Sequence, residues 1–181
     1  MTQTEENRSG VAEILDPKTD YYQVFADVDG EDLEWWKKAR EFMEFARPSL
    51  NEAWEKAEYN IPGVEEAARR GLVTDGIEID GETTTSLRAN RLIQMELART
   101  DASTATAHIV QSGLAMRSIS ECGSEEQKAK YLGPMSRMEI RGGFALTEPD
   151  HGSDSIGLET SARRDGDEWV INGEKKWIGH G

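Results

Sequence analysis

Two segments near the end of the sequence combine side chains suited to holding a flat ligand. The first runs from Phe144 to Asp154 and the second from Asn172 to Gly179. Leu146-Thr147 is predicted to end a strand, where backbone N–H groups and a hydroxyl can meet the polar edge of a planar ligand. Gly152-Ser153 forms a turn with an exposed donor, and Trp177 offers a wide aromatic face. These parts predict a pocket for a planar cofactor such as a flavin, although other planar ligands need the same parts.

The titratable side chains inside and outside these motifs give no clear catalytic group. Glu148 is a carboxylate inside the first segment and could transfer protons, but we expect it to fix the loop instead. His108 and His151 lack partners at the spacing of a metal site or a catalytic relay, so we predict no metal. The single Cys122 cannot form an intramolecular disulfide, which agrees with a reducing compartment, and we expect it to be a small packing residue.

The first three quarters of the sequence must position these motifs, and the apolar residues in this part are spaced as in helices. Apolar residues from Leu33 to Leu50 recur at helical spacing, with a kink or break expected at Pro48. Further helices are predicted from Pro62 to Gly71, from Thr85 to Leu97, from the capping residue Asp101 to about Ile119, and from the capping box of Ser124 and Gln127 to a stop at Gly133-Pro134. Residues 76–84 are predicted to be a polar loop.

The period then changes from helical to extended. Candidate strands are Gly142–Thr147, Leu158–Arg164, Trp169–Ile171 and Lys175–Ile178, with hairpin turns at Asp165-Gly166-Asp167 and at Asn172-Gly173. We therefore predict an α+β chain with a loose segment at 1–28, an all-helical domain at 29–139 and the first strands of a second domain at 140–181.

Composition narrows the class of protein. The chain has 181 residues, of which 36% are hydrophobic and 31% charged, as in a folded globular protein. Its formal net charge of -14 repels phosphate backbones, so we expect no nucleic-acid partner. No apolar run approaches the roughly 20 residues of a membrane span. Met1 to Gly10 has no features of a leader, so a cytoplasmic location is expected.

Taken together, the two motifs resemble the acyl-CoA dehydrogenase family. Supporting matches lie at Glu96–Ser103 and at Cys122–Leu132, so the resemblance covers nearly the whole chain from about Leu33. Some features are also similar to short-chain acyl-CoA oxidases and to glutaryl-CoA dehydrogenase-like members.

The resemblance implies a cofactor, a set of site residues and partners. The cofactor is FAD, and the matching positions are Phe144, Leu146, Thr147, Gly152, Ser153, Trp177, Ile178 and Gly179. Ser153 also matches a position that contacts the acyl-CoA substrate. The implied reaction is α,β-dehydrogenation of an acyl-CoA thioester, with an electron-transfer flavoprotein as acceptor and a homodimer or homotetramer as the assembly.

The same resemblance implies what the chain should lack. The middle domain of the family is β-barrel-like, and a helical bundle follows it that would lie beyond residue 181. The base of the family is a glutamate from that bundle. We therefore expect no catalytic residue in this chain and a fragment that is inactive alone.

Two departures from the family leave alternatives open. Gly179 stands where many dehydrogenases have a Thr or Ser whose hydroxyl bonds to the flavin, and glycine there resembles the oxidases. Residues 101–106 lack the arginine of glutaryl-CoA-type relatives, which disfavours a dicarboxylate substrate and leaves acyl chain length open. The alternatives are an acyl-CoA oxidase or flavin monooxygenase of the same fold, or a short binding protein without catalysis.

Overall fold

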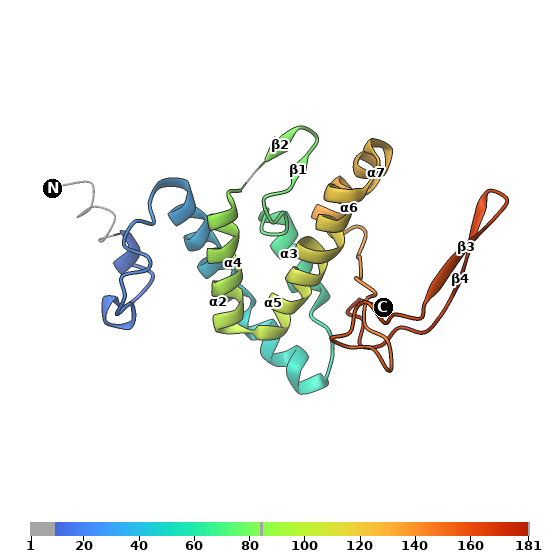
Figure 1. The fold of residues 1–181 in the computed structure, drawn as a ribbon. Helices are drawn as coiled ribbons and strands as arrows, with labels where there is room; N and C mark the ends of the chain where they lie inside the picture. Colours follow the sequence, from blue (N-terminus) through green and yellow to red (C-terminus); the bar gives the residue numbers. More distant parts are fainter. Residues whose placement is uncertain (1–9, 84, 181) are drawn as a thin grey trace.

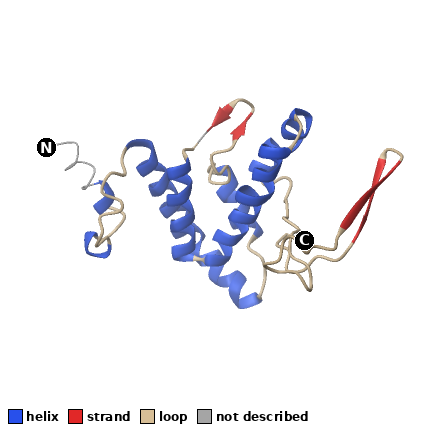
Figure 2. Cartoon of the chain, in the orientation of Figure 1, coloured by secondary structure: helices blue, strands red, loops and turns tan. Residues whose placement is uncertain are grey.

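The computed structural model describes residues 10–83 and 85–180, and helices dominate it up to Ser136 (Figures 1 and 2). The helical elements are η1 (Pro17–Thr19), α2 (Gly30–Lys56), α3 (Ile61–Arg69), α4 (Leu87–Thr100), α5 (Ala102–His108), the π-helix η2 (Ile109–Met116), α6 (Arg117–Cys122) and α7 (Glu125–Ser136). The strands are β1 (Glu78–Ile79), β2 (Glu82–Thr83), β3 (Ser161–Asp165) and β4 (Glu168–Asn172). This is the predicted α+β class.

Helix α2 is the longest element and forms one wall of the core. Its buried residues recur at helical spacing along one stripe: Leu33, Trp36, Ala39, Phe42, Met43, Ala46 and Leu50. The predicted break at Pro48 is wrong, because the helix continues to Lys56. Proline removes one backbone hydrogen bond, but Ala46 and Leu50 remain buried on either side of it and hold both turns against the core.

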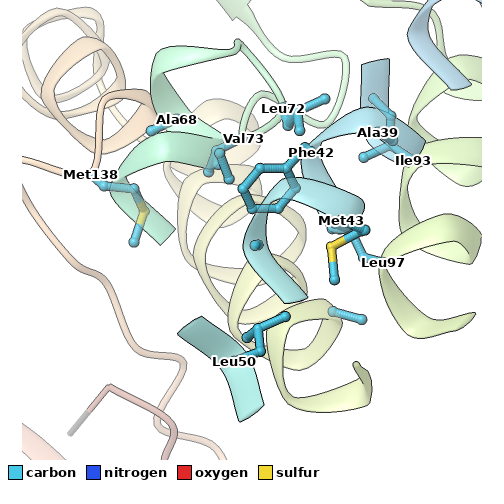
Figure 3. Packing of buried hydrophobic residues seen from close by; sticks show 13 residues of the cluster. Ala39, Phe42, Met43, Leu50, Ala68, Leu72, Val73, Ile93, Leu97 and Met138 are labelled. Atoms are coloured by element: carbon cyan, nitrogen blue, oxygen red, sulfur yellow. The ribbon is translucent and has the colours of Figure 1, made fainter. Parts of the chain in front are cut away.

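The main core lies between α2, α3, α4 and α5. Figure 3 shows Phe42 of α2 at its centre beside Val73, and Met43 of α2 beside Leu97 of α4. All four side chains are fully buried, and removing such a side chain costs about 2–5 kcal/mol. The core thus fixes α4, and through it the start of α5, relative to the end of α2.

Part of the segment predicted to be loose is packed. Val11, Ile14 and Val28 are buried in a second cluster against Trp36 and Leu92. Residues 1–9 of that segment lie outside the described residues. The packed part lies at the side of the α2–α4 pair that is far from the β3–β4 hairpin (Figure 1).

Two predicted helix starts are confirmed. The Asp101 carboxylate accepts the backbone N–H of Thr104 at 2.6 Å and so caps α5. Ser124 and Gln127 form the reciprocal capping box at the start of α7. The helix that Asp101 starts continues through η2 and α6 to Cys122, a little beyond the predicted end near Ile119.

The predicted end of α7 at Gly133-Pro134 is wrong, since the helix reaches Ser136 with Pro134 inside it. Leu132 and Met135 flank the proline and are buried in a third cluster with Met116, which keeps the last turn in place. Tertiary packing here outweighs the local preference of proline.

The loop predicted at 76–84 contains a short hairpin, in which Glu78 pairs with Thr83 and Ile79 with Glu82. Thr84 lies outside the described residues. Ile77 is buried beside Met116, so one apolar anchor holds the base of this hairpin.

One longer hairpin follows the helices. Strands β3 and β4 pair antiparallel from Ser161↔Asn172 to Asp165↔Glu168, with Gly166 at positive φ in the predicted turn. The second predicted hairpin turn, at Asn172-Gly173, is not formed, because the chain continues past it without pairing back onto β4.

Two of the four predicted strands do not form. Segments 142–147 and 175–178 carry no ladder of strand hydrogen bonds among the described residues. A strand requires a neighbour to pair with, and these segments share only single contacts with each other. Trp177 also takes a positive φ of 63°, which interrupts extended backbone.

Candidate functional site

The two motifs found in the sequence lie side by side. The Lys176 backbone N–H donates to the Thr147 carbonyl at 2.8 Å, and the Lys175 ammonium donates to the Leu146 carbonyl at 2.9 Å. A side chain at Gly143 would place its Cβ 2.9 Å from the Gly179 carbonyl oxygen. This close backbone approach requires glycine, and it brings Phe144, Leu146 and Thr147 next to Trp177, Ile178 and Gly179.

Glu148 joins the first motif to the second and to the β3–β4 hairpin. One carboxylate oxygen accepts the Lys175 ammonium at 2.8 Å and the Thr160 N–H at 2.9 Å, and the other accepts the Glu159 N–H at 2.7 Å. The Lys175 ammonium, with the Thr160 and Glu159 hydrogen bonds, holds the pKa of Glu148 far below its ordinary value. The expectation that Glu148 fixes the loop is confirmed by these contacts.

The turn after Glu148 presents Gly152 and Ser153 to solvent. Glu148 and His151 exchange two backbone hydrogen bonds, at 3.1 and 3.3 Å, which close the turn. The His151 ring lies 3.4 Å from Glu159, as expected of a structural histidine. No hydrogen bond among the described residues joins Gly152 or Ser153 to the second motif.

Trp177 is the most accessible aromatic side chain in the two motifs. Its residue is 84% exposed, and its ring contacts the Lys176 ammonium at 5.0 Å from the centroid. The hydroxyls of Thr147 and Ser153 have no hydrogen-bond partner within 10–83 and 85–180. An open indole face and open hydroxyls are the groups that a planar polar ligand would use.

Gln111 anchors the first motif to the helices. Its side-chain amide donates to the carbonyls of Met135 and Ile140, at 2.9 and 2.8 Å, and its oxygen accepts the Gly142 N–H at 2.9 Å. Gln111 lies in η2 and is fully buried. The π-helix therefore sets where the chain leaves the helices and enters the first motif.

The second motif is anchored at the same point. The Nδ1 atom of His180 lies 3.1 Å from the Gly142 carbonyl oxygen, and its Nε2 atom lies 3.1 Å from the Tyr59 hydroxyl. Tyr59 lies between α2 and α3, so this contact ties the end of the second motif to the helices.

A groove of about 620 Å³ opens between the helices and the end of the second motif. We call it the α5 groove. It is lined by Tyr59, Ile61, Ala102, Ser103, Thr106, Ala107, Val110, Arg141, Gly179 and His180. The small residues of α5 let a ligand approach the helix closely. The lining carries no carboxylate among the described residues, and a Cβ at Gly179 would lie 3.3 Å from Val110.

The remaining chemical candidates serve the fold or are exposed. Burial lowers the pKa of His108, so its neutral ring donates from Nε2 to the Leu72 carbonyl and accepts at Nδ1 from the Gln94 side-chain amide, while the Ser112 hydroxyl donates to the His108 carbonyl at 2.9 Å. The prediction that Cys122 is a packing residue is wrong, because Cys122 is exposed at the end of α6. No cluster of three metal-binding side chains occurs within the described ranges.

Sequence reasoning missed four residues of this region: Tyr59, Gln111, Arg141 and His180. Tyr59 and Gln111 lie far from the motifs in the sequence, and no local pattern distinguishes them. His180 directly follows the second motif, so its place beside Gly179 was the one signal available.

Comparison with known protein families decides the assignment. The family model described as "Acyl-CoA dehydrogenase, N-terminal domain" matches residues 29–139, which is more than half of the chain. The chain belongs to the acyl-CoA dehydrogenase family. The model described as "Acyl-CoA dehydrogenase, middle domain" matches residues 143–181, and this part of the chain carries both motifs.

Similar proteins agree with the family. The chain is 42% identical over 113 residues to the short/branched chain specific acyl-CoA dehydrogenase, mitochondrial, of Bos taurus, covering 61% of the chain and 26% of that protein. It is 34% identical over 160 residues to the Rattus norvegicus protein of the same name, covering 86% of the chain and 36% of that protein.

A solved structure has the same fold. The glutaryl-CoA dehydrogenase of Mycobacterium smegmatis, in complex with FADH2, matches with a TM-score of 0.81 at 32% identity, over 87% of this chain and 41% of that one. The chain thus spans about a quarter to two-fifths of the length of these relatives.

Proposed function

We propose that the two motifs hold FAD and that the α5 groove holds the acyl group of an acyl-CoA thioester during α,β-dehydrogenation. The observation that supports this most is the meeting of the two motifs at the groove. The Thr147–Lys176 hydrogen bond joins them, and Gly179 of the second motif lines the groove itself. The relative from Mycobacterium smegmatis, which carries FADH2, supports the choice of cofactor.

The residues present fit a flavin. The open indole of Trp177 would lie against the ring system, and the open hydroxyl of Thr147 would meet its polar edge. Phe144, Leu146, Ile178 and Gly179 would complete that wall, and Gly152 and Ser153 would contact the cofactor from the neighbouring turn, with Ser153 also reaching the acyl-CoA. When bound, FAD would supply the hydride acceptor.

The groove fits the other reactant. Ile61, Ala102, Ala107 and Val110 give it an apolar lining suited to an acyl chain. Its described lining holds no carboxylate, so we propose that the glutamate that removes the α proton comes from outside the described residues. His180 lies at the groove but is tied to Gly142 and Tyr59, which suits a structural role.

A second candidate, acyl-CoA oxidation with oxygen as the electron acceptor, is favoured by Gly179. Gly179 lacks the hydroxyl that many dehydrogenases carry at this position, and a Cβ there would crowd Val110 at 3.3 Å. The two chemistries differ in the acceptor: an electron-transfer flavoprotein for the dehydrogenase, and molecular oxygen for the oxidase. Oxygen uptake during turnover distinguishes them.

Partners and location belong to the same proposal. A homodimer or homotetramer and a cytoplasmic location remain predictions, and the two curated relatives carry "mitochondrial" in their names. Within the described ranges, no helix is both long and apolar enough to cross a membrane. A binding protein without catalysis would not dehydrogenate an acyl-CoA, and the following experiment distinguishes it from the enzyme that we propose.

The test uses the product of the complete reading frame. We expect it to bind FAD in a fluorescence titration, and we expect an acyl-CoA added without oxygen to bleach the absorbance of the oxidised flavin. Binding of FAD without bleaching by any acyl-CoA would contradict the dehydrogenation. Absence of FAD binding would contradict the proposed cofactor and reaction and favour a binding protein.

A further inference from the structure

Tyr59 stands between two hollows. One is the α5 groove. The other, which we call the end hollow, measures about 300 Å³ and is lined by Leu50, Ala53, Trp54, Ala57, Glu58, Tyr59, Asn60, Val64, Asp101, Ser103 and Thr104. Tyr59 and Ser103 line both spaces. Because serine is small, Tyr59 is the one large side chain that the two linings share.

The end hollow is suited to an apolar chain. Leu50, Ala53 and Val64 contribute apolar surface to it. Two of its polar groups are already used, because the Trp54 indole N–H donates to Asp101 at 2.9 Å and Asp101 also accepts from Thr104. An acyl chain entering this space would therefore meet mainly carbon, as in the α5 groove.

Tyr59 is held in place by His180, which directly follows the second motif. The Gly142 carbonyl can only accept, so Nδ1 of His180 carries the proton in that contact. In the neutral ring Nε2 is then an acceptor, and the Tyr59 hydroxyl donates to it at 3.1 Å. The two rings also meet edge to face, with centroids 5.9 Å apart. The Tyr59 ring is thus fixed at the boundary between the hollows.

We propose that Tyr59 is a specificity-determining residue that closes the α5 groove against the end hollow and so limits the length of the acyl chain the groove takes. This inference rests on the proposed function, because it places the acyl group in the α5 groove. His180 and Gly142 act as positioning residues through Tyr59. Removal of the ring joins the two hollows into one longer apolar channel.

Calorimetric binding of straight-chain acyl-CoA thioesters, from butanoyl to dodecanoyl, tests this in the FAD-reconstituted product of the complete reading frame. In the wild type the affinity stops rising once the chain fills the groove. In Tyr59→Ala it continues to rise beyond that length, by up to about fourfold for each methylene that enters the end hollow. Tyr59→Phe loses the hydrogen bond to His180 but keeps the ring and its edge-to-face contact, so its profile should lie closer to the wild type than to Tyr59→Ala.

An identical length profile in Tyr59→Ala and the wild type, with both proteins folded by circular dichroism, would overturn the proposal. Tyr59→Val replaces the alanine variant if the latter does not fold, with the same expectation. Length-dependent binding without flavin bleaching would sink the proposed function and leave the Tyr59 boundary standing. Flavin bleaching with an unchanged length profile would support the proposed function and overturn the Tyr59 boundary.

Discussion

Glu148 shows at the residue scale how a carboxylate inside a binding motif can serve the fold. Its carboxylate accepts hydrogen bonds from Lys175, Thr160 and Glu159, and these donors hold it against the β3–β4 hairpin and the second motif. This role was predicted from the family resemblance, which implies that the catalytic base is a glutamate of another domain. The identity of the three donors could not be predicted, since Glu159 and Thr160 meet Glu148 only through the tertiary fold.

Replacement of Glu148 by glutamine should lower the stability at pH 7, because the amide would direct a donor at the Lys175 ammonium or a backbone N–H. The pKa of Glu148 is lowered on folding, so its contribution is present above the ordinary value of 4.5 and is lost as pH falls below it. Urea unfolding from pH 7 to pH 3 measures this. The stability gap between the wild type and Glu148→Gln should narrow as pH falls from 5 to 3, and a constant gap would argue against the anchoring role.

Trp177→Ala should weaken FAD binding about tenfold, which corresponds to about 1.4 kcal/mol and to the usual contribution of aromatic stacking. Trp169→Ala is the matched control, since Trp169 is 64% exposed on β4 and does not line the α5 groove. Fluorescence titration with FAD compares the two variants. Equal affinities for both variants would remove Trp177 from the proposed flavin wall.

At the scale of elements, local signals predicted helix starts well and helix ends poorly. Asp101 and Ser124 cap helices as expected, because a cap is formed by residues close in sequence. Pro48 and Pro134 did not end their helices, because packing around them decides the outcome. Segments 142–147 and 175–178 were predicted as strands from composition, but strand formation depends on a partner that composition does not reveal.

The π-helix η2 positions the first motif through Gln111, and this anchoring can be tested by substitution. Gln111→Leu would leave the Gly142 N–H and the carbonyls of Met135 and Ile140 without their partner. We expect a loss of about 3 kcal/mol in the free energy of unfolding, since each unsatisfied buried group costs about 1–3 kcal/mol. The same substitution at Gln127, an exposed member of a capping box, should cost at most about 1 kcal/mol. Equal losses in urea unfolding would contradict the anchoring by Gln111.

At the scale of the whole molecule, the site is a junction of distant parts. The motifs and their family were readable from the sequence because each is local. The α5 groove was not, because Tyr59, Val110 and His180 come from three regions of the chain. Trp169, Ile171 and Trp177 expose apolar surface in the segment after the helices, whereas the helices enclose three buried clusters. The division of the chain at about residue 140 stays a prediction.

A structure of the complete gene product with FAD bound tests the central claim most directly. We predict the flavin ring against the Trp177 indole, its polar edge at Thr147, and one face open to the α5 groove beside Val110 and Gly179. A flavin bound elsewhere, with Trp177 and Thr147 still exposed to solvent, would contradict the account.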